Sequence, residues 1–292
     1  MWLLIGGDSE IGAATHQFLK ARGYAVSATT RRKQNVAIDR PFLDLSAPLD
    51  TWEPPAGTTA ACIFAAIARI AACDADPRGS GYVNVTQTLA LADRLLDRGI
   101  PIVFLSTNQV FDGKAPNVAP DATYSPITEY GRQKVAAETA LRARIERGLP
   151  AAILRLGKVV SPDMPLVHNW IDALSKGQPI RAFGDLTMAP AETVMVAAAV
   201  AAVMKDAARG IFQLTGPRDL SYFNIGCYLA DRLGANRALV KEGNTVDAGL
   251  PIGSARPHTT LNSSRLRDAY GFAASDVLKI VDSVVAASLQ RN

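Results

Sequence analysis

The sequence predicts an α/β protein with a doubly wound parallel sheet and a smaller C-terminal lobe. Its first half holds short apolar runs that are continuous rather than alternating, which is typical of strands buried on both faces. Segments with helical spacing separate these runs, so we expect a covering helix between successive strands. The first run ends in a glycine-rich turn that opens a helix, at the edge where such sheets bind ligands.

Strands and helices alternate through the first 156 residues. Trp2–Ile5 is a short apolar run before glycines, and Ile11–Ala21 follows with Ile11, Phe18 and Leu19 as core contacts. Later apolar runs and helically spaced segments give the remaining elements. The further strands are expected at Tyr24–Ala28, Val36–Ile38, Ala60–Ala66, Ile102–Ser106 and Ala151–Leu156, and the further helices at Asn84–Arg98 and Thr128–Arg147.

Beyond residue 156 the chain changes character, because seven prolines divide it into shorter elements. We therefore expect a smaller substrate-binding lobe there. One apolar helix, Ala191–Met204, and the strand after it, Ile211–Leu214, are expected to return to the main sheet. The expected domains are 1–160 for the dinucleotide, with 190–220 returning to it, and 161–292, mainly for the substrate.

Charge and composition argue against several kinds of site. The pI is about 9.0, yet residues 1–150 carry 16 basic and 15 acidic side chains and residues 151–292 carry 15 and 12. No basic stripe for nucleic acid is present. Three scattered histidines and three distant cysteines, without a Cys-x-x-Cys pair, predict no metal site and suit a reducing compartment.

The sequence shows no signal for export and no segment that suits a membrane span. The N-terminal residues show neither a basic region nor a cleavage site. The longest apolar run, Val194–Met204, has 11 residues, about half of what a membrane span needs. The sequence therefore predicts a soluble, cytoplasmic protein.

The turn at 6–12, GGDSEIG, joins the first expected strand to the first expected helix. A dinucleotide needs glycine there, because the turn is tight and its pyrophosphate rests on the helix N-terminus. The spacing resembles G-x-x-G-x-x-G with Ser9 in the middle position, where its side chain narrows the approach. An ordinary glycine-rich turn is the alternative, but the place in the chain favours a cofactor site. The expected contacts are Gly6, Ser9, Glu10, Ile11 and Gly12.

The end of the second expected strand, residues 29–33, reads TTRRK and contains no acid. An NAD site usually offers a carboxylate to the ribose 2′-hydroxyl, whereas a 2′-phosphate needs cations. Guanidinium groups make charge-assisted, often bidentate contacts with phosphate. Arg31 and Arg32 therefore predict NADP(H) in preference to NAD(H), and a solvated basic turn is the alternative.

The stretch EYGRQK places Tyr130 and Lys134 one helical turn apart, on one helix face. Thr107 follows the strand expected before this helix, so its hydroxyl would reach the same crevice. A free tyrosine, with a pKa of about 10, is a poor acid at neutral pH. The lysine ammonium is expected to lower the pKa of Tyr130 toward the working range. The lysine can also hold a nicotinamide ribose, while the hydride chemistry belongs to the cofactor.

Residues 106–113, STNQVFDG, and 130–134, YGRQK, stand among motifs that follow one another along nearly the whole chain. This series resembles the extended short-chain dehydrogenase/reductase family, and within it the dTDP-4-dehydrorhamnose reductase-like, sugar-nucleotide-binding branch, which has STDYVFDG. The other similar stretches are the glycine turn, Leu43-Asp44-Leu45, Asp76-Pro77, Asn84-Val85, Arg155, Gly184-Asp185 with Pro190, Arg256-Pro257 and Leu261–Leu266.

The resemblance implies a Rossmann fold, NAD(P)-dependent oxidoreductase activity in nucleotide-sugar metabolism, and a catalytic triad of Thr107, Tyr130 and Lys134. It places Asp44-Leu45 near the adenine and Ala65-Ala66 in the cofactor groove. Tyr130 and Lys134 are expected to contact the cofactor as well.

Departures from the branch gather on the substrate side. Asn108 and Gln109 stand where the branch has aspartate and tyrosine. Lys158 stands where rhamnose-forming reductases place a tryptophan near the sugar. We assign these three residues and Arg256 to the substrate pocket. The identity of the sugar therefore stays open, although the triad is intact.

The sequence thus predicts an NADPH-dependent reductase of a keto group on a nucleotide-activated sugar. A 4,6-dehydratase would want acids beside the threonine, which Asn108 and Gln109 do not supply. Two alternatives remain. One is a sugar-nucleotide epimerase on the same scaffold, which usually uses NAD, and the other is a non-catalytic NADP-binding regulatory subunit. Reductases of this kind are often homodimers, but no residue pattern here indicates one.

Overall fold

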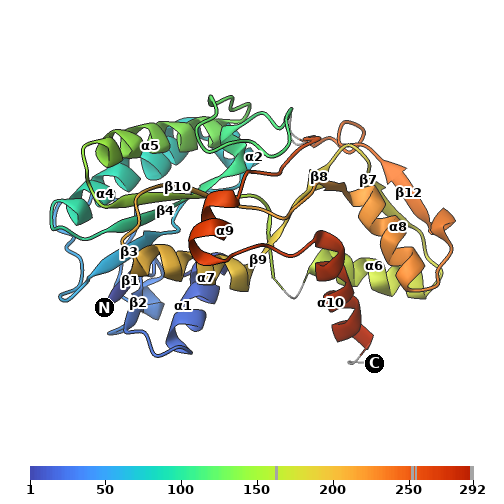
Figure 1. Cartoon of the computed structure of the whole chain (residues 1–292), viewed down its shortest axis with the longest axis horizontal. Coiled ribbons are helices and arrows are strands. Elements are labelled where there is room, and N and C mark those ends of the chain that lie inside the picture. The colour runs from blue at the N-terminus through green and yellow to red at the C-terminus, as the bar shows by residue number, and fades with distance from the viewer. Residues whose placement is uncertain (162–163, 251–252, 254, 290–292) are drawn as a thin grey trace.

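The computed structural model describes residues 1–161, 164–250, 253 and 255–289, and its largest part is a six-stranded parallel sheet (Figure 1). The strand order is β10-β5-β4-β3-β1-β2, and every neighbouring pair is parallel. The chain leaves β1 toward β2 and then returns to β3 on the other side, so the order reverses there, as in doubly wound sheets. The predicted fold class is confirmed. The strands are β1 (Trp2–Ile5), β2 (Val26–Ala28), β3 (Ala60–Ile63), β4 (Ile102–Thr107), β5 (Ala151–Leu156) and β10 (Gly210–Leu214).

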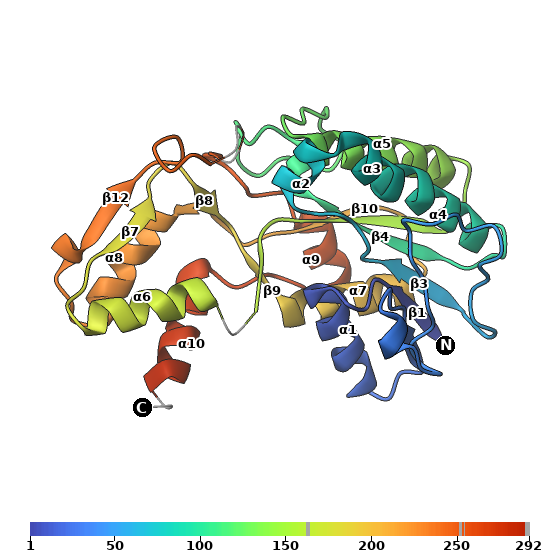
Figure 2. The same ribbon diagram turned by 180° about the vertical axis from the view of Figure 1, so that it is seen from behind.

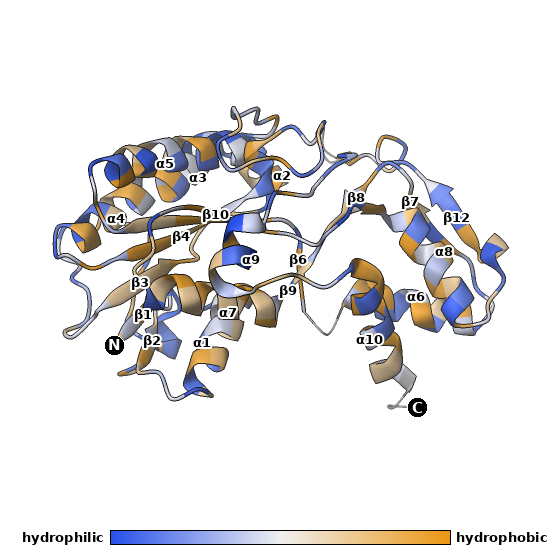
Figure 3. Cartoon of the chain, viewed as in Figure 1, coloured by the Kyte–Doolittle hydropathy of each residue, from blue (hydrophilic) through white to orange (hydrophobic). Residues whose placement is uncertain are grey.

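Helices cover both faces of this sheet, as Figures 1 and 2 show. Leu3 and Ile5 of β1 belong to one hydrophobic cluster, whereas Leu4 belongs to the cluster on the opposite face. Successive strand residues point to opposite faces, so a strand covered on both sides is largely apolar. Figure 3 shows the strands of the sheet as largely hydrophobic. One face carries α1 (Glu10–Lys20), α7 (Thr193–Lys205) and α9 (Ser264–Tyr270), and the other carries η2 (Tyr82–Gln87), α4 (Thr88–Leu96) and α5 (Glu129–Glu146).

A third hydrophobic cluster lies in the C-terminal half, around Trp170, Ile225, Leu229 and Val281. It packs helices against short strands, apart from the main sheet (Figure 1). Strand β10 nevertheless pairs with β5, and α7 packs on α1. The division into a dinucleotide domain and a substrate lobe stays a prediction. The elements here are β6 (Val159–Val160), α6 (Pro165–Ser175), β7 (Ile180–Phe183), β8 (Thr187–Met188), β9 (Ala191–Glu192), β11 (Leu220–Ser221), α8 (Tyr222–Arg232), η4 (Arg237–Leu239), β12 (Val240–Gly243) and α10 (Val277–Leu289).

The strand expected at Val36–Ile38 is wrong. A short helical turn, η1 (Lys33–Asn35), precedes it, and Ala37 and Arg40 close a tight turn through two backbone hydrogen bonds. Ile38 is fully exposed, so this segment buries too little apolar surface to act as a strand. Residues 41–43 run beside Thr30 instead, through Thr30 N–H to Pro41 O and Leu43 N–H to Thr30 O, both at 3.0 Å.

Two short helices between β3 and η2 went unpredicted, α2 (Ile70–Ala75) and α3 (Pro77–Gly81). Asp76 caps α3 by accepting from Gly79 N–H at 2.9 Å, and Pro77 stands at the first helical position. An aspartate followed by proline is typical of a helix start, but the two glycines that follow disfavour a helix. Another short turn, η3 (Asn108–Val110), follows β4. Among the described helices, none is long and apolar enough to cross a bilayer.

Candidate active site

The glycine turn and the start of α1 form one compact structure. Gly6 has φ of +94°, a left-handed conformation that favours glycine, and its N–H donates to Thr29 Oγ1 at 2.9 Å. Ser9 caps α1, since its Oγ donates to Gly6 O at 2.8 Å and accepts from Gly12 N–H at 3.1 Å. The Ser9 side chain is therefore bound within the turn. A Cβ at Gly12 would overlap the Gly6 carbonyl oxygen, so Gly12 must be glycine to keep the turn closed.

A first cavity, of about 650 Å³, extends from this turn past the carboxyl ends of β1, β2 and β3. It collects most of the residues predicted to bind a cofactor. Glu10 and Ile11 line the neighbouring cavity instead, and Gly12 lines neither of the two. The predicted residues in the first cavity are Gly6, Ser9, Arg31, Arg32, Asp44, Leu45, Ala65 and Ala66.

Arg31 and Arg32 bring positive charge to this first cavity. Both side chains are exposed, and neither guanidinium has a hydrogen-bond or salt-bridge partner within the part of the chain that the structure describes. Asp44 is engaged, because its Oδ1 accepts from Ser46 N–H at 2.9 Å and from the Ser46 hydroxyl at 2.8 Å. These bonds, with a smaller effect of Arg31, hold the pKa of Asp44 below its ordinary value. The two arginines are thus free to meet an anionic ligand.

A second cavity, of about 550 Å³, adjoins the first, and Ser9, Phe64, Ala66 and Ala68 line both. It brings together side chains from the carboxyl end of β4, from α5 and from the C-terminal half. Every residue predicted as catalytic or substrate-binding lies in its wall. These residues are Thr107, Asn108, Gln109, Tyr130, Lys134, Lys158 and Arg256.

Thr107 and the start of α5 face this cavity together. The Thr107 Oγ1 accepts from Gln109 N–H at 3.2 Å, which fixes the hydroxyl at the end of β4. Tyr130 and Lys134 are buried, at 9% and 3% exposure. Lys134 Nζ donates to the Leu105 carbonyl at 2.9 Å and lies 6.0 Å from the Tyr130 ring centroid.

Gly131 accounts for the glycine inside EYGRQK. A Cβ at this position would overlap the Gln109 carbonyl oxygen and lie 3.1 Å from Pro126 Cβ. The Thr128 hydroxyl caps the helix by accepting from Gly131 N–H at 3.1 Å. The first turn of α5 therefore touches the loop after β4, and this contact brings Tyr130 to the cavity that Thr107 lines.

Burial decides the protonation of the Tyr/Lys pair. It raises the pKa of Tyr130 above its ordinary value, with a smaller contribution from Cys73. It lowers the pKa of Lys134 to about 8, although Glu138 and Cys73 act in the opposite direction. The predicted lowering of the Tyr130 pKa by Lys134 is therefore wrong for this structure, because removal of the phenol from water is the largest influence on this pKa and Lys134 is not among its causes. A neutral phenol results, which can donate a proton.

Arg256 is a buried cation of the second cavity, at 3% exposure, as Lys134 is. Its Nη1 donates to the Phe111 carbonyl at 2.7 Å, and burial lowers its pKa to about 10. Its Nη2 is buried and has no hydrogen-bond partner within the described ranges. The same holds there for Gln109 Oε1 and Ser106 Oγ, and all three residues line this cavity. Buried polar atoms normally have partners, so these three fit a site that is completed by a ligand.

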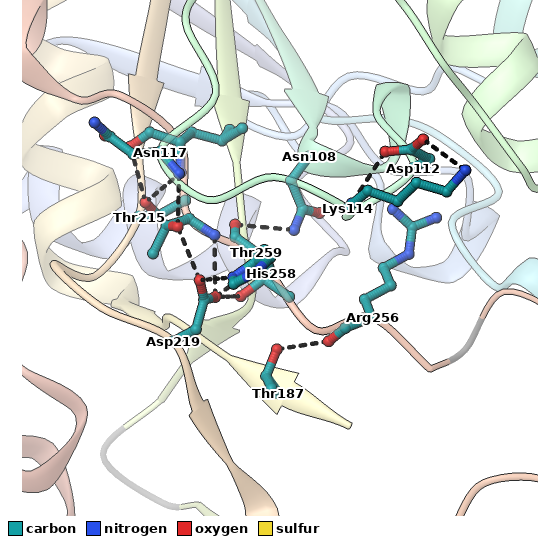
Figure 4. A network of polar contacts seen from close by, with 12 residues as sticks. Asn108, Asp112, Lys114, Asn117, Thr187, Thr215, Asp219, Arg256, His258 and Thr259 are labelled. Atoms are coloured by element: carbon teal, nitrogen blue, oxygen red, sulfur yellow. Dashed lines mark hydrogen bonds and ion pairs between the residues drawn. The ribbon is translucent and has the colours of Figure 1, made fainter. Parts of the chain in front are cut away.

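Asp219 fastens the segment that carries Arg256 (Figure 4). Its Oδ1 accepts from Thr259 N–H at 2.6 Å and from the Thr259 hydroxyl at 2.8 Å, and its Oδ2 accepts from the Thr260 hydroxyl at 2.9 Å. Thr259 O in turn accepts from Asn108 Nδ2 at 3.2 Å. Asn108 and Arg256 are thus held by one network.

Sequence reasoning missed several residues of both cavities. Thr259 lines the second cavity and is held by Asp219, which lines neither cavity; the two are 40 residues apart, so no local pattern marks the pair. Asp8 lines the first cavity, although only its neighbours in the turn were assigned to the cofactor from the sequence. Lys158, which was predicted, lines the second cavity with an exposed side chain. The C-terminal half also adds Leu186, Thr187, Met188 and Tyr222 to the second cavity.

Comparison with known proteins agrees with this architecture. A model of the RmlD substrate binding domain family matches residues 1–289. The dTDP-4-keto-6-deoxy-D-glucose reductase of Streptomyces niveus is 27% identical over 242 residues, which are 82% of this chain and 81% of that protein. A probable low-salt glycan biosynthesis reductase of Haloferax volcanii is 28% identical over 200 residues, 66% of this chain and 65%, under two thirds, of that protein.

Solved structures show the same fold at lower identity. The dTDP-4-dehydrorhamnose reductase of Clostridium acetobutylicum superposes with a TM-score of 0.79 and 20% identity, over 99% of this chain and all of that chain. That likeness concerns the fold, whereas the family model spans almost the whole sequence. The chain therefore belongs to the RmlD substrate binding domain family, within the NAD(P)-dependent extended short-chain dehydrogenase/reductases.

Proposed function

We propose that this chain reduces a keto group on a nucleotide-activated sugar, with NADPH as the reductant. One observation carries the proposal: Thr107, Tyr130 and Lys134 line a cavity that adjoins the one formed by the glycine turn. A hydroxyl, a neutral phenol and a buried amine at one place suit the reduction of a carbonyl. The reductase named in Streptomyces niveus, which is similar over most of this chain, supports the same reaction class.

The residues of the first cavity fit a dinucleotide. The glycine turn opens α1, whose N-terminus suits a pyrophosphate, and Arg31 and Arg32 are free to meet a 2′-phosphate. A nicotinamide cofactor bound there supplies the hydride. Lys134 would hold its ribose, and Ala65 and Ala66 would lie along it.

Proton transfer is the task of the triad. Tyr130 donates its phenolic proton to the substrate oxygen as negative charge develops on that oxygen. The Thr107 hydroxyl donates a hydrogen bond to the same oxygen and orients it. The ammonium form of Lys134 stabilises the phenolate left on Tyr130, which then recovers a proton from water.

The substrate side carries groups that suit a sugar diphosphate. Arg256 presents an unpaired Nη2, and Lys158 adds a second, exposed cation. The amides of Asn108 and Gln109 can donate to sugar hydroxyls or accept from them. Because Arg256 and Tyr222 come from the C-terminal half, we assign residues 161–292 mainly to the substrate lobe.

The test is turnover of purified protein with NADPH and a panel of dTDP- and UDP-linked keto-sugars. Reduction consumes NADPH, and the product gains two hydrogen atoms, which mass spectrometry detects. An epimerase would return an isomer of the same mass without net consumption of NADPH. Binding of NADPH without turnover of any panel member would favour a regulatory subunit and contradict the proposal.

A further inference from the structure

Asp8 reaches from the glycine turn to the end of β2. Its Oδ2 accepts from Thr30 Oγ1 at 2.8 Å and from Arg31 N–H at 3.2 Å. Its Oδ1 pairs with Arg40 Nη2 at 2.7 Å. Asp8 also lines the first cavity, as Arg31 and Arg32 do. An acid therefore lies at this strand end, although residues 29–33 contain none, because the turn supplies it.

The three donors around Asp8 form an anion cradle, made of the Thr30 hydroxyl, the Arg31 N–H and the Arg40 guanidinium. Hydroxyl, main-chain amide and guanidinium donors are the groups that hold phosphate oxygens in proteins. Thr30 is 1% exposed, so bulk water has almost no access to its hydroxyl. The carboxylate of Asp8 thus occupies these donors, and Asp8 presents its charge to the first cavity, which Thr30 and Arg40 do not line.

We infer that Asp8 sets the preference between NADP(H) and NAD(H) by opposing Arg31 and Arg32. The inference rests on the proposed function, because it concerns the cofactor of that site. A 2′-phosphate, with about −1.5 to −2 charges as for phosphate monoesters in general, is repelled by the carboxylate that lines the same cavity.

A ribose 2′-hydroxyl responds in the opposite way, because it is neutral and can donate a hydrogen bond. Among the residues that the structure describes, the Oδ1 of Asp8 accepts only from Arg40, so one of its lone pairs stays available to such a hydroxyl. Asp8 therefore favours NADH while the two arginines favour NADPH. The chain accepts both cofactors, with a narrower preference than Arg31 and Arg32 alone would give.

The test compares dissociation constants of NADPH and NADH for wild type, Asp8→Asn and Asp8→Ala, by calorimetry at low ionic strength. The ratio of the NADH constant to the NADPH constant should rise about tenfold in both variants, as expected for one charge at a partly exposed site. Adenosine 2′,5′-bisphosphate and AMP isolate the contribution of the 2′-phosphate and should shift in the same direction. Thermal melting shows whether each variant is folded.

Asp39→Asn is the matched control. It removes one negative charge from a nearby residue whose carboxylate pairs with Lys20, at 2.6 Å, and does not line the first cavity. It should leave the ratio unchanged. An unmoved ratio in both Asp8 variants, a shift toward NADH, or an equal shift in the control would overturn the inference. If wild type reduces keto-sugars but the ratio is the same in the Asp8 variants, the inference about Asp8 is refuted and the proposed function stands. If wild type binds neither NADPH nor NADH, the proposed function is refuted as well.

Discussion

Replacing Tyr130 by phenylalanine removes one oxygen atom, and the structure separates its effect on folding from its effect on catalysis. The side chain is 9% exposed, and its hydroxyl makes no hydrogen bond to any residue that the structure describes. The substitution therefore breaks no internal hydrogen bond and leaves the ring packed. We expect the free energy of unfolding to change by less than about 1 kcal/mol, which is the net value of a typical hydrogen bond.

Turnover should fall steeply in the same variant. Burial keeps the pKa of Tyr130 above its ordinary value, so the phenol is protonated and available as the acid at neutral pH. General acid catalysis contributes about 10²–10⁴-fold, and kcat should fall by a factor in that range. Thr107→Ala should be milder, because it removes an orienting hydrogen bond and no proton donor.

Three measurements on the same preparation decide the matter: NADPH oxidation with a keto-sugar that wild type reduces, NADPH affinity by calorimetry, and thermal melting. The reasoning requires lost turnover with intact melting and intact NADPH binding. Unchanged turnover would show that Tyr130 is structural. A lower melting temperature together with weaker NADPH binding would show that the hydroxyl supports the fold rather than the reaction.

Three further changes test the remaining parts of the site. Replacing Arg31 and Arg32 together by alanine should weaken NADPH binding and leave NADH nearly unaffected, and equal losses in calorimetry would sink the cofactor assignment. Lys158→Ala should raise KM for the sugar nucleotide while NADPH affinity holds; a ligand complex with Lys158 turned away from the cavity would contradict this. The folded-state pKa of Lys134, about 8, lies below its ordinary value of 10.5, so the unfolded chain binds more protons between these values. The free energy of unfolding contributed by Lys134 should therefore rise with pH across that window, and Lys134→Met should remove the rise; identical pH profiles in denaturant titrations would refute it.

Features with a local signal could be predicted from the sequence. The strand that holds Leu3 and Leu4 is apolar at every position because both sheet faces are covered, and the Tyr130–Lys134 spacing is fixed by the helix itself. Val36–Ile38 shows the limit of that reasoning, since an apolar triplet becomes a strand only where a neighbouring strand pairs with it.

Features that depend on distant partners could not be predicted. Asp8 and Arg40 are 32 residues apart and meet only after β2 is in place. The direction of the Tyr130 pKa shift depends on how much of the phenol the surrounding elements bury, and residue spacing does not report burial. The hydrogen bonds that Asp219 accepts from Thr259 and Thr260, close to Arg256 in the chain, likewise join residues 40 and 41 positions apart.

The contact between Gly131 and the Gln109 carbonyl limits how the enzyme can be redesigned. Altering substrate choice would begin at Asn108 and Gln109, whose backbone lies directly against the first turn of the helix that holds Tyr130. Exchanging the side chains of Asn108 and Gln109 leaves this backbone contact with Gly131 intact. Inserting or deleting a residue would move the loop after β4, and the Tyr130 phenol would move with it. Substrate selectivity and the rate of reduction would then change together. Libraries aimed at new sugars should therefore vary side chains at constant loop length.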